Sequence, residues 1–331
     1  AGGAGLIWLE ATAVGESGRA SPRQLWLNRQ TVGRFAELRE EIARAARNAP
    51  DGAGNPVCIL QLTHSGRFSK PTGRPAPVIA YHDPYLSRLH IDDRDIQPVT
   101  DDELERLEEQ MENAAVLAKE AGFDGVDVKC CHRYLASELL SAFDRDGKFG
   151  GSFENRTRLL RETAARIRGR VGPSLLVTTR LNLYDGFPLP HAWGAGKNAD
   201  EVELEEPLRL IRELHADGMN LISLTMGCPY INPHVNRPSN HYDKPSTENP
   251  LVGVARLVDG TRRVQNAIRD LTVVGVGYSW LGEFSPYLAA GEKEQNGVGI
   301  VGYGRESFAY PDFAADICRT GRLKKGKMLH C

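Results

Sequence analysis

A group of proton donors follows one apolar stretch of the chain. The segment "VDVKCCHRYL" opens at residue 126 as a β-branched run and then brings Lys129, His132 and Tyr134 close together in sequence. An ammonium and an imidazole can donate hydrogen bonds to an oxygen on which negative charge develops. A phenol can supply a proton, and the neighbouring cations are expected to lower the pKa of Tyr134. Each residue alone also fits a salt bridge, a loop contact or packing. Together they predict a catalytic site at the end of a buried strand.

Three further polar residues lie at the ends of other apolar runs. Gln61 and His64 end the run 57–64, and Arg180 lies near the end of the run 175–182. A buried arginine needs an anion or an electron-rich acceptor to offset its desolvation. Arg180 therefore indicates a ligand, or else a salt bridge to a neighbouring carboxylate. Gln61 could equally be a core amide bound to backbone, and His64 could cap a loop, so both alternatives stay open.

Closely spaced glycines end the last two apolar runs, as "GVG" at 275–277 and "GYGR" at 302–305. Glycine lets backbone N–H groups approach an anion, and an arginine at the start of the final helix adds positive charge. The pattern predicts a phosphate site at Gly277, Gly304 and Arg305. Ordinary tight turns are the alternative.

Seven apolar runs alternate with amphipathic stretches. The runs are typical of parallel strands covered on both faces and lie at 5–11, 57–64, 125–130, 175–182, 221–227, 271–277 and 298–304. Helices are expected at about 31–46, 100–122, 153–169, 202–217, 251–269, 281–290 and 308–320. Thr100 and Glu103 predict a capping box at the start of the second helix.

This uniform alternation predicts one domain, residues 1–331, and either a doubly wound sheet or a barrel. No G-x-G-x-x-G follows the first run, and barrels commonly bind phosphate after strands seven and eight. We therefore expect a TIM (β/α)8 barrel in which residues 5–11 are strand two and strand one precedes Ala1. Long excursions at 65–99, 183–200 and 228–250 leave the carboxyl ends of strands, and they are expected to form lids or pocket walls.

Composition narrows the class of protein. The chain has 331 residues, 41% of them hydrophobic and 25% charged, and its net charge of −2 gives no electrostatic case for a nucleic-acid or membrane partner. No apolar run approaches the ~20 residues of a membrane span. Six cysteines without a C-x-x-C motif predict reduced thiols in a cytoplasmic protein, with the terminal Cys331 as the exception.

The motifs, taken in order, resemble those of the old yellow enzyme family of FMN-dependent oxidoreductases, including its 2,4-dienoyl-CoA reductase branch. The resemblance covers essentially the whole chain. It rests on "GAGLIWLEATAVGESGR" (3–19), "QLTHSGR" (61–67), "GFDGVDVKCCHRYLASELLS" (122–141), "KFGGSFENRTRLL" (148–160) and "GYGRESFAYPDF" (302–313). "QLTHSGR" is similar to the Q-L-x-H-x-G-R motif of the family, and "KFGGSFENRTRLL" is similar to its Y-G-G-S-x-E-N-R-x-R-F motif.

The resemblance implies a role for each candidate residue. In the flavin site, the Ala11 backbone would contact FMN, Gln61 would bind the pyrimidine edge, Arg180 would stabilise negative charge near N1, and Gly277, Gly304 and Arg305 would hold the phosphate. At the substrate, Lys129 and His132 would grip a carbonyl oxygen and Tyr134 would donate the proton. The implied reaction is reduction of an activated C=C bond in a small unsaturated carbonyl, acid or thioester, with NADH or NADPH as reductant and hydride delivered from flavin N5.

The chain departs from the family pattern at several positions. Lys129 replaces the usual His or Asn, so the substrate is expected to be an acid or a thioester rather than a simple enone. Arg133 replaces the glycine before the tyrosine, Tyr278 replaces the second glycine of the strand-seven pair, and Phe149 replaces a tyrosine. In the reductase branch an iron–sulfur cysteine cluster begins near this point, so Cys331 is a candidate [4Fe–4S] ligand in a longer chain.

Other functions remain open on the sequence. Lys129 could serve as the amine of a Schiff-base lyase, which would leave Gln61 and Arg180 without a role. A catalytically inactive relic is a second alternative. Amine or C–N oxidation, as in multidomain relatives, is a third. The exact substrate, the choice between NADH and NADPH, and homo-oligomer formation are not fixed by the sequence.

Overall fold

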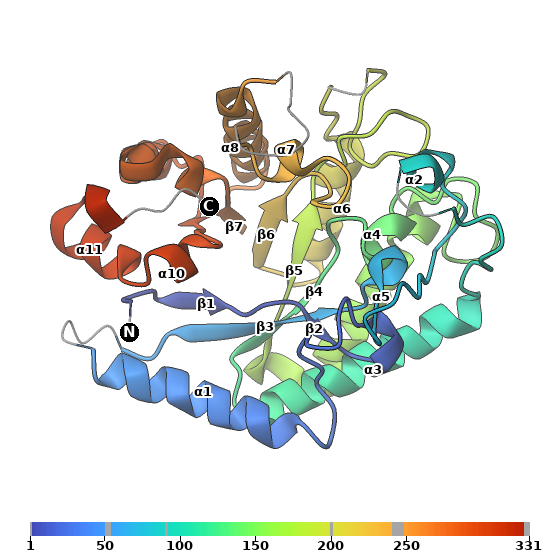
Figure 1. Cartoon of the computed structure of the whole chain (residues 1–331), viewed down its shortest axis with the longest axis horizontal. Coiled ribbons are helices and arrows are strands. Elements are labelled where there is room, and N and C mark those ends of the chain that lie inside the picture. Colours follow the sequence, from blue (N-terminus) through green and yellow to red (C-terminus); the bar gives the residue numbers. More distant parts are fainter. Residues whose placement is uncertain (1, 50–53, 90–91, 199–200, 240–247, 328–331) are drawn as a thin grey trace.

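A parallel β-sheet forms the centre of the molecule. The computed structural model describes residues 2–49, 54–89, 92–198, 201–239 and 248–327 (Figure 1). The strands are β1 (Leu6–Trp8), β2 (Thr12–Ala13), β3 (Val57–Thr63), β4 (Gly125–Val128), β5 (Leu176–Asn182), β6 (Leu221–Thr225), β7 (Thr272–Gly275) and β8 (Ile300–Val301). Their order is β1-β3-β4-β5-β6-β7-β8, with β2 also paired to β3, and every pair is parallel. All seven expected runs therefore contain strands of one sheet.

The first run differs from the expected strand over 5–11, because β1 covers only Leu6–Trp8 and a second short strand, β2, begins after the run at Thr12. Trp8 lies opposite Ile59 and Thr12 lies opposite Leu62, so the first strand carries one residue more than β3 between these pairs. Such an extra residue is a bulge, which bends the strand and interrupts the ladder. Ala11 lies in this bend, between β1 and β2.

Helices follow the strands in alternation. The longer ones are α1 (Val32–Arg47), α3 (Asp101–Glu120), α5 (Phe153–Val171), α6 (Glu205–Ala216), α8 (Pro250–Ala267), α9 (Ser285–Glu294) and α11 (Phe313–Thr320). Short helices α2 (Pro84–Leu89), α4 (Leu135–Leu139) and α7 (Pro233–Asn236) were not expected, and a fourth, α10 (Glu306–Ala309), overlaps the start of the predicted helix 308–320. The predicted capping box is confirmed, because Thr100 Oγ1 accepts from the Glu103 N–H at 3.2 Å and Glu103 Oε2 accepts from the Thr100 N–H at 2.8 Å.

The last two expected helices have different bounds. The predicted helix 308–320 is two helices, α10 and α11, because Pro311 lies between them and cannot supply the N–H that a continuous helix needs. The predicted helix 281–290 becomes a 3₁₀ segment, η4 (Tyr278–Phe284), followed by α9.

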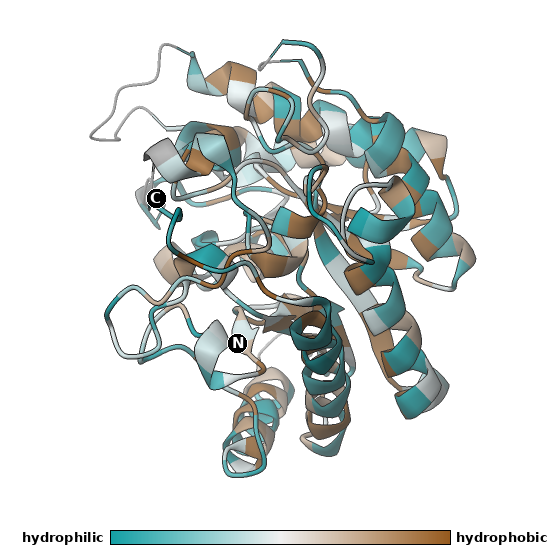
Figure 2. Cartoon of the chain, turned by 90° about the vertical axis from the view of Figure 1, so that its right-hand side faces the viewer, coloured by the Kyte–Doolittle hydropathy of each residue, from teal (hydrophilic) through white to brown (hydrophobic). Residues whose placement is uncertain are grey.

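Strand alternation separates two faces of the sheet. Val126 and Val128 of β4 point toward the helices and join the main hydrophobic core with residues of α3 and α5. Asp127 and Lys129 therefore point to the opposite, inner face. Another part of that inner face is filled by an apolar cluster around Ile59, Leu221 and Val274. The outer helices carry mostly hydrophilic residues on their exposed sides, with hydrophobic stripes between them (Figure 2).

The sheet curls so that its two edges approach each other. Ala315 of α11 donates its backbone N–H to Gly2 O at 2.8 Å, so the segment before β1 contacts the helix after β8 (Figure 1). A side chain at Gly2 would lie 1.7 Å from Pro311 O, so only glycine allows this approach. Within the described residues β1 and β8 are not paired, and the sheet is a curled part of a barrel. The closed (β/α)8 barrel with a preceding strand one stays a prediction.

No helix in the described part of the chain is long and apolar enough to cross a membrane.

Candidate active site

Asp127 is the centre of a buried polar cluster on the inner face. Its carboxylate is fully buried and accepts hydrogen bonds from Trp8 Nε1 at 2.7 Å, from Gln61 Nε2, and from the Arg180 backbone N–H at 2.7 Å. Burial raises the pKa of Asp127, while these three donors oppose the rise. Because the Gln61 amide nitrogen donates to Asp127, its Oε1 oxygen is directed to act as an acceptor.

Arg180 brings a positive charge to the same face. Its terminal nitrogen lies 3.5 Å from Thr225 Oγ1, and its Nε is buried without a hydrogen-bond partner. The structure gives it no carboxylate partner within the described residues, so the salt-bridge alternative is wrong there. An orphaned guanidinium N–H and an amide oxygen on the same inner face fit a planar, polar, electron-rich ligand. The proposed flavin ring meets that requirement.

Lys129 extends the cluster toward the carboxyl ends of the strands. It is 6% exposed, and its Nζ lies 3.8 Å from the centre of the Tyr134 ring, a cation–π contact. Burial lowers the pKa of Lys129 to about 8. Strand parity alone did not decide the direction of this side chain. The structure places it inward.

His132 follows in a left-handed conformation, with φ of 64°. Its Nε2 lies 3.0 Å from Asn236 Nδ2 and 3.5 Å from Thr225 Oγ1. Because an amide nitrogen can only donate, Nε2 accepts and the ring proton resides on Nδ1. Burial, with Arg180 and Lys129 nearby, holds the pKa of His132 well below its usual value. His132 is therefore a neutral donor at physiological pH.

Tyr134 lies in an aromatic stack. Its Oη is 2.9 Å from Tyr230 Oη, and Phe68 stacks on Tyr230 with ring centres 4.2 Å apart. Burial raises the pKa of Tyr134, and Tyr230 raises it further. The expectation that neighbouring cations would lower this pKa is wrong, because burial outweighs them. The phenol stays protonated, which is the form that a proton donor needs.

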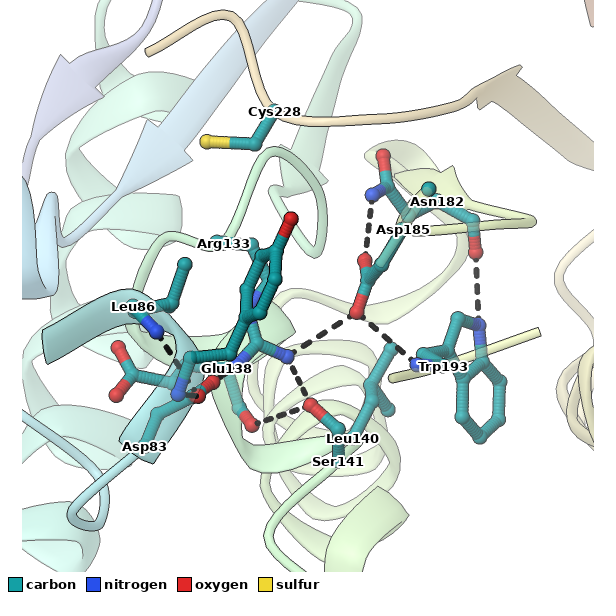
Figure 3. Close-up of polar contacts among 12 residues, drawn as sticks. Asp83, Leu86, Arg133, Glu138, Leu140, Ser141, Asn182, Asp185, Trp193 and Cys228 are labelled. Atoms are coloured by element: carbon teal, nitrogen blue, oxygen red, sulfur yellow. Dashed lines mark hydrogen bonds and ion pairs between the residues drawn. The ribbon is translucent and has the colours of Figure 1, made fainter. Parts of the chain in front are cut away.

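Arg133, between these residues, points away from the site into a second buried network (Figure 3). Its guanidinium is fully buried and forms ion pairs with Asp83 and with Asp185, the latter at 3.1 Å. Tyr81 Oη and Ser141 Oγ complete the shell, with Tyr81 at 3.0 Å. Arg133 thus ties the excursions 65–99 and 183–200 to the loop after β4.

The same residue explains one departure from the family pattern. Arg133 has φ of 58°, a left-handed conformation that glycine adopts without strain. A non-glycine residue persists there only when its surroundings fix it. The two buried carboxylates, together with the Tyr81 and Ser141 hydroxyl oxygens that accept from Arg133, supply that constraint. The resulting turn presents His132 and Tyr134 to the inner face.

The two glycine turns lie side by side. The Gly302 N–H donates to Gly275 O at 2.8 Å, which joins the loops after β7 and β8. Gly277 has φ of 104°, and a Cβ there would lie 3.0 Å from Leu257 Cδ1. Gly304 and Arg305 are exposed. Backbone N–H groups and a cation are therefore available together at this edge of the sheet, as the predicted phosphate site requires.

Tyr278, which replaces the second glycine, leaves that edge open. Its side chain is fully buried in a cluster with Val254 and Val258 of α8. The ring therefore lies inside the protein beside the loop.

Two other predicted positions have local structural contacts. His64 Nδ1 accepts from the Gly66 N–H at 3.1 Å, and burial lowers its pKa to about 4. The loop-capping alternative for His64 is thus confirmed. Ala11 lies at the bulge, where its carbonyl oxygen accepts from Gln24 Nε2 at 2.8 Å.

The cysteines are free thiols in the described residues. Cys58, Cys130, Cys131 and Cys228 are buried, and burial raises their pKa values, whereas Cys318 is exposed. Cys331 lies outside the described residues, so its role as an iron–sulfur ligand stays a prediction. No group of three metal-binding side chains occurs in the part of the chain that the structure describes.

Replacement of Asp127 by asparagine is expected to weaken FMN binding by about 10-fold, the value of one hydrogen bond. The new amide hydrogens would oppose the donors Trp8 and Gln61, so Gln61 would have to rotate and lose its acceptor orientation. Fluorescence titration with FMN measures the affinity, and circular dichroism checks the fold. Unchanged affinity in a folded variant would show that Asp127 does not orient Gln61.

Sequence reasoning missed four residues that complete the site: Asp127, Thr225, Tyr230 and Asn236. A signal existed for Asp127, since a carboxylate in the middle of an apolar strand needs donors. Tyr230 and Asn236 come from the excursion 228–250, which was expected as a pocket wall. Their pairing with Tyr134 and His132 depends on the folded path of that loop.

The whole chain matches a known family. Residues 1–323 match the model of the NADH:flavin oxidoreductase / NADH oxidase family. NADPH dehydrogenase of Halalkalibacterium halodurans is 31% identical over 232 residues, which are 69% of this chain and 60% of that protein. NADPH dehydrogenase of Bacillus pumilus is 36% identical over 232 residues, 68% of this chain and 60% of that protein.

A solved structure has the same fold. An old yellow enzyme homologue from Zymomonas mobilis superposes with a TM-score of 0.65 at 20% identity, covering 97% of this chain and 81% of that one. The matches to the two dehydrogenases span about 60% of their length. With a family match over residues 1–323 and the barrel-type sheet, the chain belongs to the NADH:flavin oxidoreductase family of old yellow enzymes.

Proposed function

We propose that residues 1–331 form one FMN-binding barrel domain that reduces an activated C=C bond in a small unsaturated molecule, with NADH or NADPH as reductant. The observation that carries the proposal is the convergence of two sets of residues on one inner face. The first set is Gln61, which offers an acceptor, and Arg180, which offers a cation, both bound to Asp127. The second set is Lys129 and His132, which lie near Arg180 toward the carboxyl ends of the strands.

The residues of the first set fit FMN. Gln61 Oε1 would accept from the N–H of the pyrimidine edge, and Arg180 Nε would donate to the part of the ring that becomes negative on reduction. The backbone at Ala11 would contact the ring, and Gly277, Gly304 and Arg305 would hold the phosphate. Bound FMN supplies the hydride.

The second set would act on the substrate. Lys129 Nζ and His132 Nδ1 would donate to the substrate oxygen, where negative charge grows during hydride transfer. Tyr134 would then give its proton to the α-carbon, and Tyr230, 2.9 Å from its oxygen, can pass a replacement proton from the surface.

The visible spectrum of the FMN-loaded protein tests this proposal. We expect a flavin spectrum that bleaches on anaerobic addition of NADPH or NADH and returns when 2-cyclohexenone or another activated alkene is added. A protein that takes up no FMN would refute the flavin site. A flavin that bleaches and is reoxidised by no alkene would refute alkene reduction, and direct bleaching by an amine would favour C–N oxidation.

One observation favours a second function. The pKa of Lys129, lowered to about 8, suits an amine that attacks a carbonyl carbon. In that case borohydride would trap an aldehyde or ketone substrate on Lys129, which mass spectrometry detects. No role for the Gln61 and Arg180 set follows from this chemistry, so alkene reduction accounts for more of the site.

A further inference from the structure

The Lys129 side chain is buried without a counter-ion. It makes no hydrogen bond or ion pair with the described residues, and its Nζ contacts the face of Tyr134 at 3.8 Å. A cation–π contact satisfies none of the three N–H donors of an ammonium. An ammonium that is buried in this way is costly unless an acceptor reaches it.

Of the fixed charges around Lys129, Arg180 lowers its pKa and Asp127 raises it. Arg180 and Lys129 both lower the pKa of His132, and Arg237 adds to the effect, so three cations surround this ring. The nearby carboxylate is Asp127, and it already accepts from three donors, including the Arg180 backbone. Among these described groups, the two cations Lys129 and Arg180 therefore lie beside the one carboxylate of Asp127.

We propose that the substrate is an unsaturated carboxylate, whose carboxylate group conjugated to the C=C bond binds Lys129 Nζ and His132 Nδ1. This inference rests on the proposed alkene reduction. Arg180 would balance the negative charge of a reduced flavin, so Lys129 would be available to pair with a second anion. A carboxylate supplies both a full negative charge and two acceptor oxygens, whereas an aldehyde, ketone or thioester oxygen supplies no net charge.

A lysine at this position would also stabilise the charge that develops during the proposed reaction. Hydride addition to the β-carbon of a carboxylate places a second negative charge on a group that already has one. A neutral donor would stabilise such a dianion poorly, while an ammonium offsets one whole charge in a site shielded from water.

The titration of Lys129 supports the same assignment. Its pKa of about 8 means that the free protein holds the ammonium below pH 8 and loses it above. A bound anion requires the ammonium, so affinity for the anion is constant below pH 8 and falls as pH rises through that value.

The other groups facing Lys129 do not share this titration. Cys131 and Cys228 have pKa values raised to about 11 and about 12, and that of His132 is well below its usual value. Tyr134 is held protonated by its raised pKa. Asp127, whose pKa is raised, has all three of its donors fixed by the fold.

The test compares binding of (E)-cinnamate and methyl cinnamate to the FMN-loaded protein by calorimetry and by perturbation of the flavin spectrum. We expect cinnamate to bind more tightly at pH 7, and its advantage over the ester to disappear between pH 8 and 10. Lys129→Met should lose about 10- to 100-fold in affinity for cinnamate and little for the ester. Lys129→Arg, which keeps the charge, should retain part of it.

Lys119→Met is the matched control, because Lys119 Nζ bonds Val171 O on the outer face, and this variant should bind cinnamate normally. Equal affinity for cinnamate and its ester in the wild type would overturn the inference. So would an equal loss for both ligands in Lys129→Met. If the protein takes up FMN and is reoxidised by methyl cinnamate or 2-cyclohexenone yet does not bind cinnamate, alkene reduction stands and only the carboxylate assignment fails.

Discussion

Replacement of Arg133 by methionine is expected to lower the free energy of unfolding by about 3–5 kcal/mol, the cost of removing one partner from a buried ion pair. Arg133 pairs with Asp83 and Asp185, and all three side chains are fully buried (Figure 3). The variant would leave both carboxylates without their cation. Urea unfolding followed by circular dichroism measures the loss.

Two further variants separate this effect from a general loss of packing. Addition of Asp83→Asn and Asp185→Asn to Arg133→Met removes the unpaired charges and should restore part of the stability. Arg209→Met, which breaks an exposed pair with Glu154, should change the midpoint little. An Arg133→Met variant that unfolds at the wild-type urea concentration would mean that the network does not stabilise the loop after β4.

Replacement of Tyr134 by phenylalanine is expected to slow alkene-dependent reoxidation of the flavin by about 10²- to 10⁴-fold, the usual contribution of a positioned proton donor. Flavin reduction by NADPH should be unaffected, because no proton from Tyr134 is needed for that step. Anaerobic stopped-flow absorbance separates the two half-reactions.

Tyr230→Phe is the matched control for this prediction. It keeps the ring that stacks on Phe68 and removes only the hydroxyl that lies 2.9 Å from Tyr134 Oη. We expect a smaller loss, since Tyr134 retains its own proton and only its resupply is impaired. Wild-type reoxidation rates in Tyr134→Phe would show that solvent supplies the proton.

Most of the framework could be predicted from the sequence because it depends on local patterns. The seven apolar runs became strands of one parallel sheet, since near-continuous apolar runs are stable only where both faces of the sheet are covered. The capping box at Thr100 formed because its two hydrogen bonds involve residues three apart. The bulge between Trp8 and Thr12 could not be predicted, because a bulge exists only relative to the register of the neighbouring strand.

The chemistry of the candidate site could likewise be predicted only in part from the sequence. Residue types alone indicated donors at Lys129, His132 and Tyr134, and a cation at Arg180. The sequence could not indicate which acceptors these side chains have, because Asp127, Tyr230 and Asn236 come from other strands and from a distant loop. It also could not give the sign of the Tyr134 pKa shift, which depends on burial rather than on sequence neighbours.

By itself the sequence determined the alternation of strands and helices and the kinds of groups at the strand ends, because both follow from side-chain chemistry and spacing along the chain. Only the tertiary structure decided that Lys129 faces inward with no counter-ion among the described residues and that Arg133 faces away into a carboxylate network. The physical reason is that the desolvation of a charge and the position of its partners are properties of the packed molecule, in which residues 83, 133 and 185 meet although they are about 50 positions apart in sequence.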